Sequence, residues 1–144
     1  MRSIETTIVI EAGTSKVWET LMNFENYSSW NPFIIDIQGK AAEGQNLNTQ
    51  IKIGDKKVQK FKPKVLVVNE NEHFRWKGKL FIKGLFDGEH YFILEKIDDN
   101  KTKLIHGENF SGLLSKPILK MIKEDTLKGF AQMNQALKNN VESK

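Results

Sequence analysis

Most of the first 110 residues alternate between hydrophobic and polar side chains, and this period of two predicts β-strands. The clearest case is residues 47–53, where Leu, Thr, Ile and Ile alternate with polar residues as in a half-buried strand. Similar strand-like runs cover residues 4–10, 33–37, 58–68, 74–82, 90–94 and 104–110. Because short turns separate most of these runs, we expect an antiparallel sheet of about seven strands. Pro63 inside the run 58–68 indicates a sheet edge or a bulge.

Two short helices are expected between the first two strands. Thr14 or Ser15 can cap the first helix, and Asn26 can cap a very short second helix that ends near Trp30. Pro32 limits the second helix, because the residue before a proline avoids helical geometry.

The C-terminal segment changes its hydrophobic spacing from two to three or four residues. This spacing predicts one long helix of about six turns that begins near Ser115. Its apolar stripe consists of Leu119, Ile122, Thr126, Phe130, Met133, Leu137 and Val141. Such a helix buries its stripe against the concave face of a curved sheet, so we expect an α+β fold with one domain over residues 1–144.

The stripe is interrupted by small side chains at Thr126 and Gly129. One interpretation is that they leave room for a cavity between helix and sheet. The other is that they allow the helix to pack closely on the sheet. The sequence leaves both open.

Polar residues interrupt the alternation of the last two predicted strands. If residues 98–100 form the turn between them, His90 lies opposite Glu108 and Phe92 lies opposite His106, all on one face of the sheet. Two imidazoles and a carboxylate among large apolar groups indicate the wall of a pocket.

Charge and composition exclude several classes of protein. The chain has 22 basic and 18 acidic residues, a net charge of +4, and no Cys. No apolar run approaches the ~20 residues that span a bilayer, and the N-terminus lacks the apolar core of a secretory signal. We therefore expect a cytoplasmic protein without disulfides, thiol chemistry or membrane insertion.

A lysine-rich stretch at residues 56–64 raises the question of nucleic-acid binding, because aromatic residues between lysines can stack on bases. Arginine, which dominates recognition of bases and phosphates, occurs only at Arg2 and Arg75. The stretch is better explained as a solvent-exposed strand edge, and we expect no nucleic-acid partner. It comprises Lys56, Lys57, Lys60, Phe61, Lys62 and Lys64.

Several motifs resemble the START and birch-pollen-allergen superfamily, in its polyketide cyclase/dehydrase-like branch. They are Trp18, the run Tyr-Ser-Ser-Trp-Asn-Pro-Phe at 27–33, Gly-Glu-His at 88–90, and His-Gly-Glu-Asn-Phe-Ser-Gly at 106–112. The resemblance covers nearly the whole chain and implies a helix-grip fold, with an internal cavity that usually holds a hydrophobic small molecule. It also implies that His90 and Glu108 face this cavity. The superfamily includes cyclases, lipid carriers, hormone receptors and chaperone activators, so the fold does not fix the function.

Three chemistries are compatible with His90, His106 and Glu108. They could act as a general acid and base, as aldol-type cyclisation or dehydration requires. They could form a hydrogen-bonded polar patch that orients a ligand, which is the simpler interpretation. Two His and one carboxylate also match a catalytic zinc site, but the helical His-Glu-x-x-His motif is absent, so we expect no metal and no cofactor.

We therefore expect binding of a hydrophobic or aromatic small molecule between the sheet and the C-terminal helix. The first alternative is a cyclase/dehydratase-type lyase or isomerase that uses His90 and Glu108, and the second is a chaperone-interacting module. The predicted ligand-binding residues are Trp30, Phe33, Trp76, His90, Phe92, His106, Glu108, Phe110, Ile122, Thr126 and Phe130.

Overall fold

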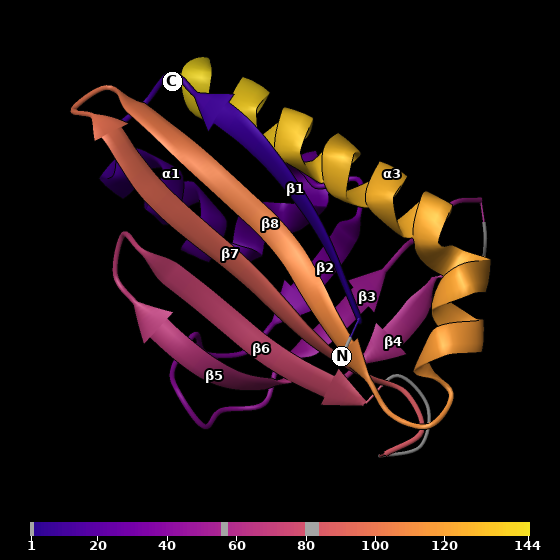
Figure 1. The fold of residues 1–144 in the computed structure, drawn as a ribbon. Coiled ribbons are helices and arrows are strands. Elements are labelled where there is room, and N and C mark those ends of the chain that lie inside the picture. The colour runs from indigo at the N-terminus through magenta and orange to yellow at the C-terminus, as the bar shows by residue number, and fades with distance from the viewer. Residues whose placement is uncertain (1, 56–57, 80–83) are drawn as a thin grey trace.

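A computed structural model describes residues 2–55, 58–79 and 84–144. Figure 1 shows a curved antiparallel sheet, a smaller sheet behind it, and a long helix that runs beside the first strand. The α+β architecture expected from the hydrophobic pattern is confirmed. The described residues do not include Lys56, Lys57 or the end of the predicted strand 74–82, which contains Phe81.

The strands form two sheets. The larger has the order β1-β8-β7-β6-β5, with β1 at Arg2–Ile10, β8 at Lys101–Ser111, β7 at Asp87–Asp98, β6 at His73–Lys79 and β5 at Lys64–Asn69. The smaller has the order β2-β3-β4, with β2 at Ile34–Gln38, β3 at Asn48–Ile51 and β4 at Gln59–Phe61.

The predicted strand at 58–68 is divided at Pro63. The residues before it form β4 of the small sheet, and those after it form β5 of the large sheet. A proline has no N–H to donate to a strand ladder, so the chain changes sheets at this point. The described strands therefore number eight in two sheets, where the sequence suggested about seven in one.

The helices lie where the sequence placed them, but their caps differ. They are α1 at Thr14–Met22, the 3₁₀ turn η1 at Phe24–Asn26, α2 at Tyr27–Trp30 and α3 at Ser115–Glu142. Gly13 and Leu114 occupy the N-cap positions of α1 and α3. Asn26 does precede α2 as predicted, although its side chain makes no capping hydrogen bond within the described residues.

Gly13 takes the cap position because the chain has no room for a side chain there. A Cβ on Gly13 would lie 2.6 Å from the carbonyl oxygen of Asp99, in the turn between β7 and β8. The start of α1 is therefore fixed by packing against that turn.

The pairing of β7 with β8 confirms the predicted register. His90 lies opposite Glu108 and Phe92 lies opposite His106. The connecting loop between Asp98 and Lys101 has two residues where three were expected, and a register shift between Lys96 and Asp98 keeps the predicted pairing. Because a shift of one residue turns every side chain to the other face, this register determines which groups point inward.

The outer face of the large sheet carries a polar ladder across three of its strands. The Tyr91 hydroxyl donates to Glu5 Oε2 at 2.6 Å, and the Arg75 guanidinium lies 4.6 Å from the centre of the Tyr91 ring. Burial and the bond to Glu5 raise the pKa of Tyr91 to about 12. Tyr91 reaches Glu5 by passing over Gly107, whose missing side chain leaves the space.

Candidate functional site

Two buried histidines lie at the centre of the concave face. His90 on β7 and His106 on β8 are 1 % and 0 % exposed, and their Nε2 atoms are 2.7 Å apart. Hydrogen bonding between two ring nitrogens requires that one carries a proton and the other does not. The pair therefore has a defined donor and a defined acceptor.

A chain of hydrogen bonds continues from His106 to the helix and back to the sheet. His106 Nδ1 is 2.8 Å from Asn134 Oδ1, and Asn134 Nδ2 donates to Thr6 Oγ1 at 2.8 Å. Thr6 Oγ1 in turn donates to the main-chain carbonyl of His106 at 3.0 Å. Burial and the neighbouring His90 hold the pKa of His106 well below its ordinary value of 6.5, although the bond to Asn134 acts in the opposite direction.

Aromatic rings enclose the imidazoles and fix their orientation. His106 stacks on Phe130 of α3, with ring centres 4.1 Å apart, and lies 4.4 Å from Phe92. Trp76 of β6 covers His90 at 5.1 Å. The sequence predicted these residues for one site, and the structure brings them together.

Glu108 ends the polar group on the side of His90 away from His106. Its Oε1 lies 3.5 Å from His90 Nδ1, an ion-pair distance that is longer than a normal hydrogen bond. The Glu108 side chain is 12 % exposed and makes no hydrogen bond to any of the described residues. Its second carboxylate oxygen therefore remains available as an acceptor.

Phe33 fills the space beneath the middle of α3. A Cβ on Gly129 would lie 2.5 Å from a carbon of the Phe33 ring, so the glycine lets this ring pack against the helix. The close-packing interpretation of Gly129 is therefore correct, and the cavity interpretation is wrong at this position. Phe33 also lies 6.3 Å from His90, ring centre to ring centre, and borders the site.

Thr126 differs from Gly129, because its buried hydroxyl lacks a hydrogen-bond partner among the described residues. The residue is 2 % exposed, and its Oγ1 finds no hydrogen-bond partner in the part of the chain that the structure describes. A helical threonine usually bonds its hydroxyl to a preceding main-chain carbonyl. The unpaired hydroxyl is consistent with the cavity interpretation at this position.

Three of the predicted ligand-binding residues have neighbours outside the histidine pair. Trp30 packs on Tyr27 of the same short helix, with ring centres 5.3 Å apart, and its buried Nε1 has no partner among the residues described. Phe110 stacks on Phe86 at 5.3 Å. Ile122 is half-buried on α3 and packs against the core.

Sequence reasoning missed Asn134 and Thr6. Asn134 follows Phe130 by four residues and precedes Leu137 by three, so it occupies the buried stripe of α3. A polar residue on an apolar stripe was the available signal. Thr6 gave none, because threonine is an ordinary strand residue.

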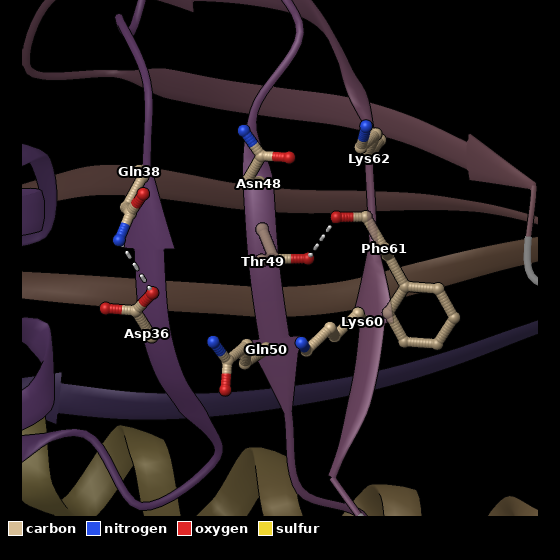
Figure 2. A pocket seen from close by; sticks show the side chains of 8 residues that line it. All are labelled: Asp36, Gln38, Asn48, Thr49, Gln50, Lys60, Phe61 and Lys62. Carbon is tan, nitrogen blue, oxygen red and sulfur yellow. Dashed lines mark hydrogen bonds between the residues drawn. The ribbon is translucent and has the colours of Figure 1, made fainter.

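The small sheet carries a groove of about 420 Å³ on the face that points away from the large sheet (Figure 2). Polar side chains dominate its lining, and Gln38 Nε2 donates to Asp36 Oδ2 along β2 at 3.3 Å. It contains none of the predicted site residues. Its polar lining does not suit a hydrophobic ligand.

A second groove, of about 410 Å³, lies between the end of β3 and the middle of α3. It is lined by Pro32, Lys52, Gly54, Asp55, Asp125, Lys128, Gly129 and Gln132. It adjoins the helix segment that carries Thr126, because Asp125 and Gly129 form part of its wall.

Two further observations concern metal and membrane. Within residues 2–55, 58–79 and 84–144, no three His, Cys, Asp or Glu side chains are grouped so that they could hold a metal ion. None of the described helices is both long and apolar enough to cross a membrane.

Known structures share this fold at low sequence identity. An aromatase/cyclase, ZhuI from Streptomyces sp. R1128, has a TM-score of 0.80 and 13 % identity, over 98 % of this chain and 93 % of that one. A START superfamily protein from Mycobacterium smegmatis has a TM-score of 0.74 and 20 % identity, over 98 % and 97 %. Norcoclaurine synthase from Thalictrum flavum, in complex with dopamine and hydroxybenzaldehyde, has a TM-score of 0.75 and 12 % identity, over 99 % and 87 %.

Sequence comparison assigns the family. No curated protein sequence matches the chain significantly. The family model described as "Polyketide cyclase / dehydrase and lipid transport" matches residues 1–142. The chain therefore belongs to the polyketide cyclase/dehydrase and lipid transport family.

Proposed function

We propose that this protein binds a hydrophobic or aromatic small molecule between the large sheet and α3, beside Glu108 and Thr126. The observation that carries the proposal is the Thr126 hydroxyl, which is buried without a hydrogen-bond partner within the described structure. The partly exposed Glu108 carboxylate supports it, because its second oxygen accepts no hydrogen bond from the described residues. Buried polar groups are normally hydrogen-bonded, and an exception calls for an explanation. A bound ligand supplies the missing partners.

The topology puts both groups on the same side of the histidine pair. β8 and α3 are joined by residues 112–114, so moving forward along β8 and backward along α3 both lead toward this turn. Glu108 lies two residues beyond His106 on β8, and Thr126 lies one helical turn before Phe130 on α3. Since Phe130 stacks on His106, both polar groups lie on the turn side of that contact.

Glycines leave space on the sheet at this end. Glu108, His90 and Trp76 form one row across β8, β7 and β6. The next row toward the turn contains Phe110, Gly88 and Gly78. Two of its three members lack side chains, and the Cβ position of Gly78 is 3.6 Å from Pro63. The proposed flat apolar molecule would lie beside Pro63 in this row.

The neighbouring groove offers a route of access. It passes between the end of β3 and α3, and Asp125 and Gly129 on its wall flank Thr126 along the helix. The structural relatives support the ligand class. One of them is an aromatase/cyclase, and another was solved with dopamine and hydroxybenzaldehyde.

Filling the proposed site should block binding. We expect a polarity-sensitive naphthalene probe to bind the purified protein with a Kd of order micromolar, and we expect Ile122→Trp to weaken that binding at least tenfold. Met121→Trp is the matched control, because the neighbouring Met121 is 74 % exposed and faces away from the sheet. Equal binding by wild type and Ile122→Trp, with both proteins folded, would contradict the proposal.

The geometry also supports a second candidate, a cyclase/dehydratase-type enzyme. The observation in its favour is the approach of His90 Nδ1 to Glu108 Oε1 at 3.5 Å, beside the proposed ligand site. Such a pair can move a proton to or from a bound substrate. If it does, Glu108→Gln should keep binding of a poly-β-keto thioester and abolish its turnover, whereas a carrier shows no turnover in either protein.

A further inference from the structure

The hydrogen bonds around His106 can run in one direction only. A main-chain carbonyl accepts and never donates, so the Thr6 hydroxyl uses its single proton on the carbonyl of His106. Thr6 Oγ1 must therefore accept from Asn134, which places the Asn134 amide nitrogen at Thr6 and its oxygen at His106. The amide oxygen also only accepts, so His106 carries its proton on Nδ1.

The tautomer of His106 determines which ring nitrogen of His90 carries the proton. A neutral His106 with its proton on Nδ1 presents a bare Nε2 to its neighbour. His90 must then donate from its own Nε2 across the distance of 2.7 Å. The neutral His90 ring consequently has a bare Nδ1, the atom that faces Glu108.

The contact between His90 and Glu108 is therefore incomplete without a further hydrogen. With His90 neutral and Glu108 ionised, a lone pair on Nδ1 faces a carboxylate oxygen at 3.5 Å. Two acceptors thus lie next to each other, and a hydrogen supplied by a bound ligand satisfies one of them, while Glu108 has a further oxygen that accepts.

We propose that the ligand carries a hydroxyl group, as a phenol or an enol, and that this group binds between Glu108 and His90. It donates its hydrogen to a Glu108 oxygen, beside the bare Nδ1 of His90. An ether in the same place can accept but cannot donate, so it leaves the carboxylate unpaired. Asn134 and Thr6 are positioning residues, because they set the tautomer of His106 and through it the proton of His90. This inference rests on the proposed ligand site.

Two matched probes, 2-naphthol and 2-methoxynaphthalene, separate this inference from the proposed function. We expect both to bind the wild type, with 2-naphthol preferred by roughly tenfold, the usual cost of leaving a buried acceptor unpaired. Glu108→Met should keep the binding of 2-methoxynaphthalene and abolish the preference. Comparison of the ratio between the two proteins cancels the difference in how water solvates the free probes.

Each result has one meaning. If neither probe binds the wild type, the proposed ligand site is wrong. If 2-methoxynaphthalene binds as tightly as 2-naphthol, the ligand site stands and the hydroxyl inference is overturned. The inference is also overturned if Glu108→Met keeps the full preference for 2-naphthol.

The positioning role has its own readout in the ¹⁵N chemical shifts of the imidazoles. We expect wild-type His106 to be protonated on Nδ1 alone, and Asn134→Leu to release it into a mixture of tautomers. Thr126→Val on the same helix is the control and should leave the His106 shifts of the Nδ1–H form. A wild-type His106 protonated on Nε2, or an Asn134→Leu protein with unchanged tautomer, would overturn the assignment.

Discussion

The buried histidine chain predicts that the protein loses stability in mild acid. His106 is fully buried, and its pKa is held well below 6.5 by burial and by the neighbouring His90. A second proton would go to Nε2, which already faces the donating Nε2 of His90 at 2.7 Å. One of the two hydrogen bonds would then be lost inside the core.

The sign and size follow from linkage. In the unfolded chain His106 takes up a proton near its ordinary pKa of 6.5, whereas in the folded protein it remains neutral to lower pH. The unfolded state thus binds more protons below pH 6.5, and the free energy of unfolding falls as pH falls. The loss is at most about 1.4 kcal/mol per pH unit, or about 2 kcal/mol between pH 6.5 and pH 5. It stops once pH falls below the folded-state pKa.

Urea denaturation at pH 7, 6 and 5 measures this effect. The wild type should lose stability over this range, and His106→Gln, which keeps an acceptor for His90, should lose less, by up to about 2 kcal/mol. His73→Gln is the control, because partial burial and Arg75 also lower the pKa of His73, but on the outer face of the sheet. If wild type and His106→Gln respond to pH identically, His106 is not the buried neutral group described here.

Two further predictions concern single side chains. Gly107→Ala should destabilise the protein by about 1–3 kcal/mol in thermal or urea denaturation, because its Cβ would lie 2.4 Å from the Tyr91 hydroxyl and 2.9 Å from the main-chain oxygen of Ile4. Gly78→Ala is the matched strand control, since its Cβ would meet Pro63 at an ordinary 3.6 Å, and an equal loss there would contradict the packing argument. Thr126→Val should leave the ligand-free protein equally or more stable, because the hydroxyl that it removes has no partner among the described residues, yet it should weaken binding of the naphthalene probe. A loss of stability above about 1 kcal/mol would show that this hydroxyl is hydrogen-bonded after all.

The sequence predicted the parts of this molecule that depend on local rules. The alternation of the two runs and the turn residues between them predicted the pairing of His90 with Glu108, and a register shift between Lys96 and Asp98 compensates for a loop shorter than expected. The period of α3 likewise identified its buried stripe. Both features need only neighbours in the chain.

The rest depends on contacts between distant segments. The pattern at 58–68 was that of a strand, and only the tertiary fold assigns its halves to different sheets. Gly129 and Thr126 were equivalent small residues until the Phe33 ring distinguished them. The chain from His106 through Asn134 to Thr6 joins residues 128 positions apart, which no local pattern encodes.

Intermolecular NOEs from bound 2-methoxynaphthalene to ¹³C-labelled methyl groups test the central claim most directly. The ligand site predicts NOEs to the methyl groups of Ile122 and Thr126, on the segment of α3 nearest the turn at 112–114. It predicts none to Leu137 and Val141, which are buried at the other end of the same stripe. NOEs to Leu137 and Val141, or to Thr49 beside the groove on the small sheet, would contradict it.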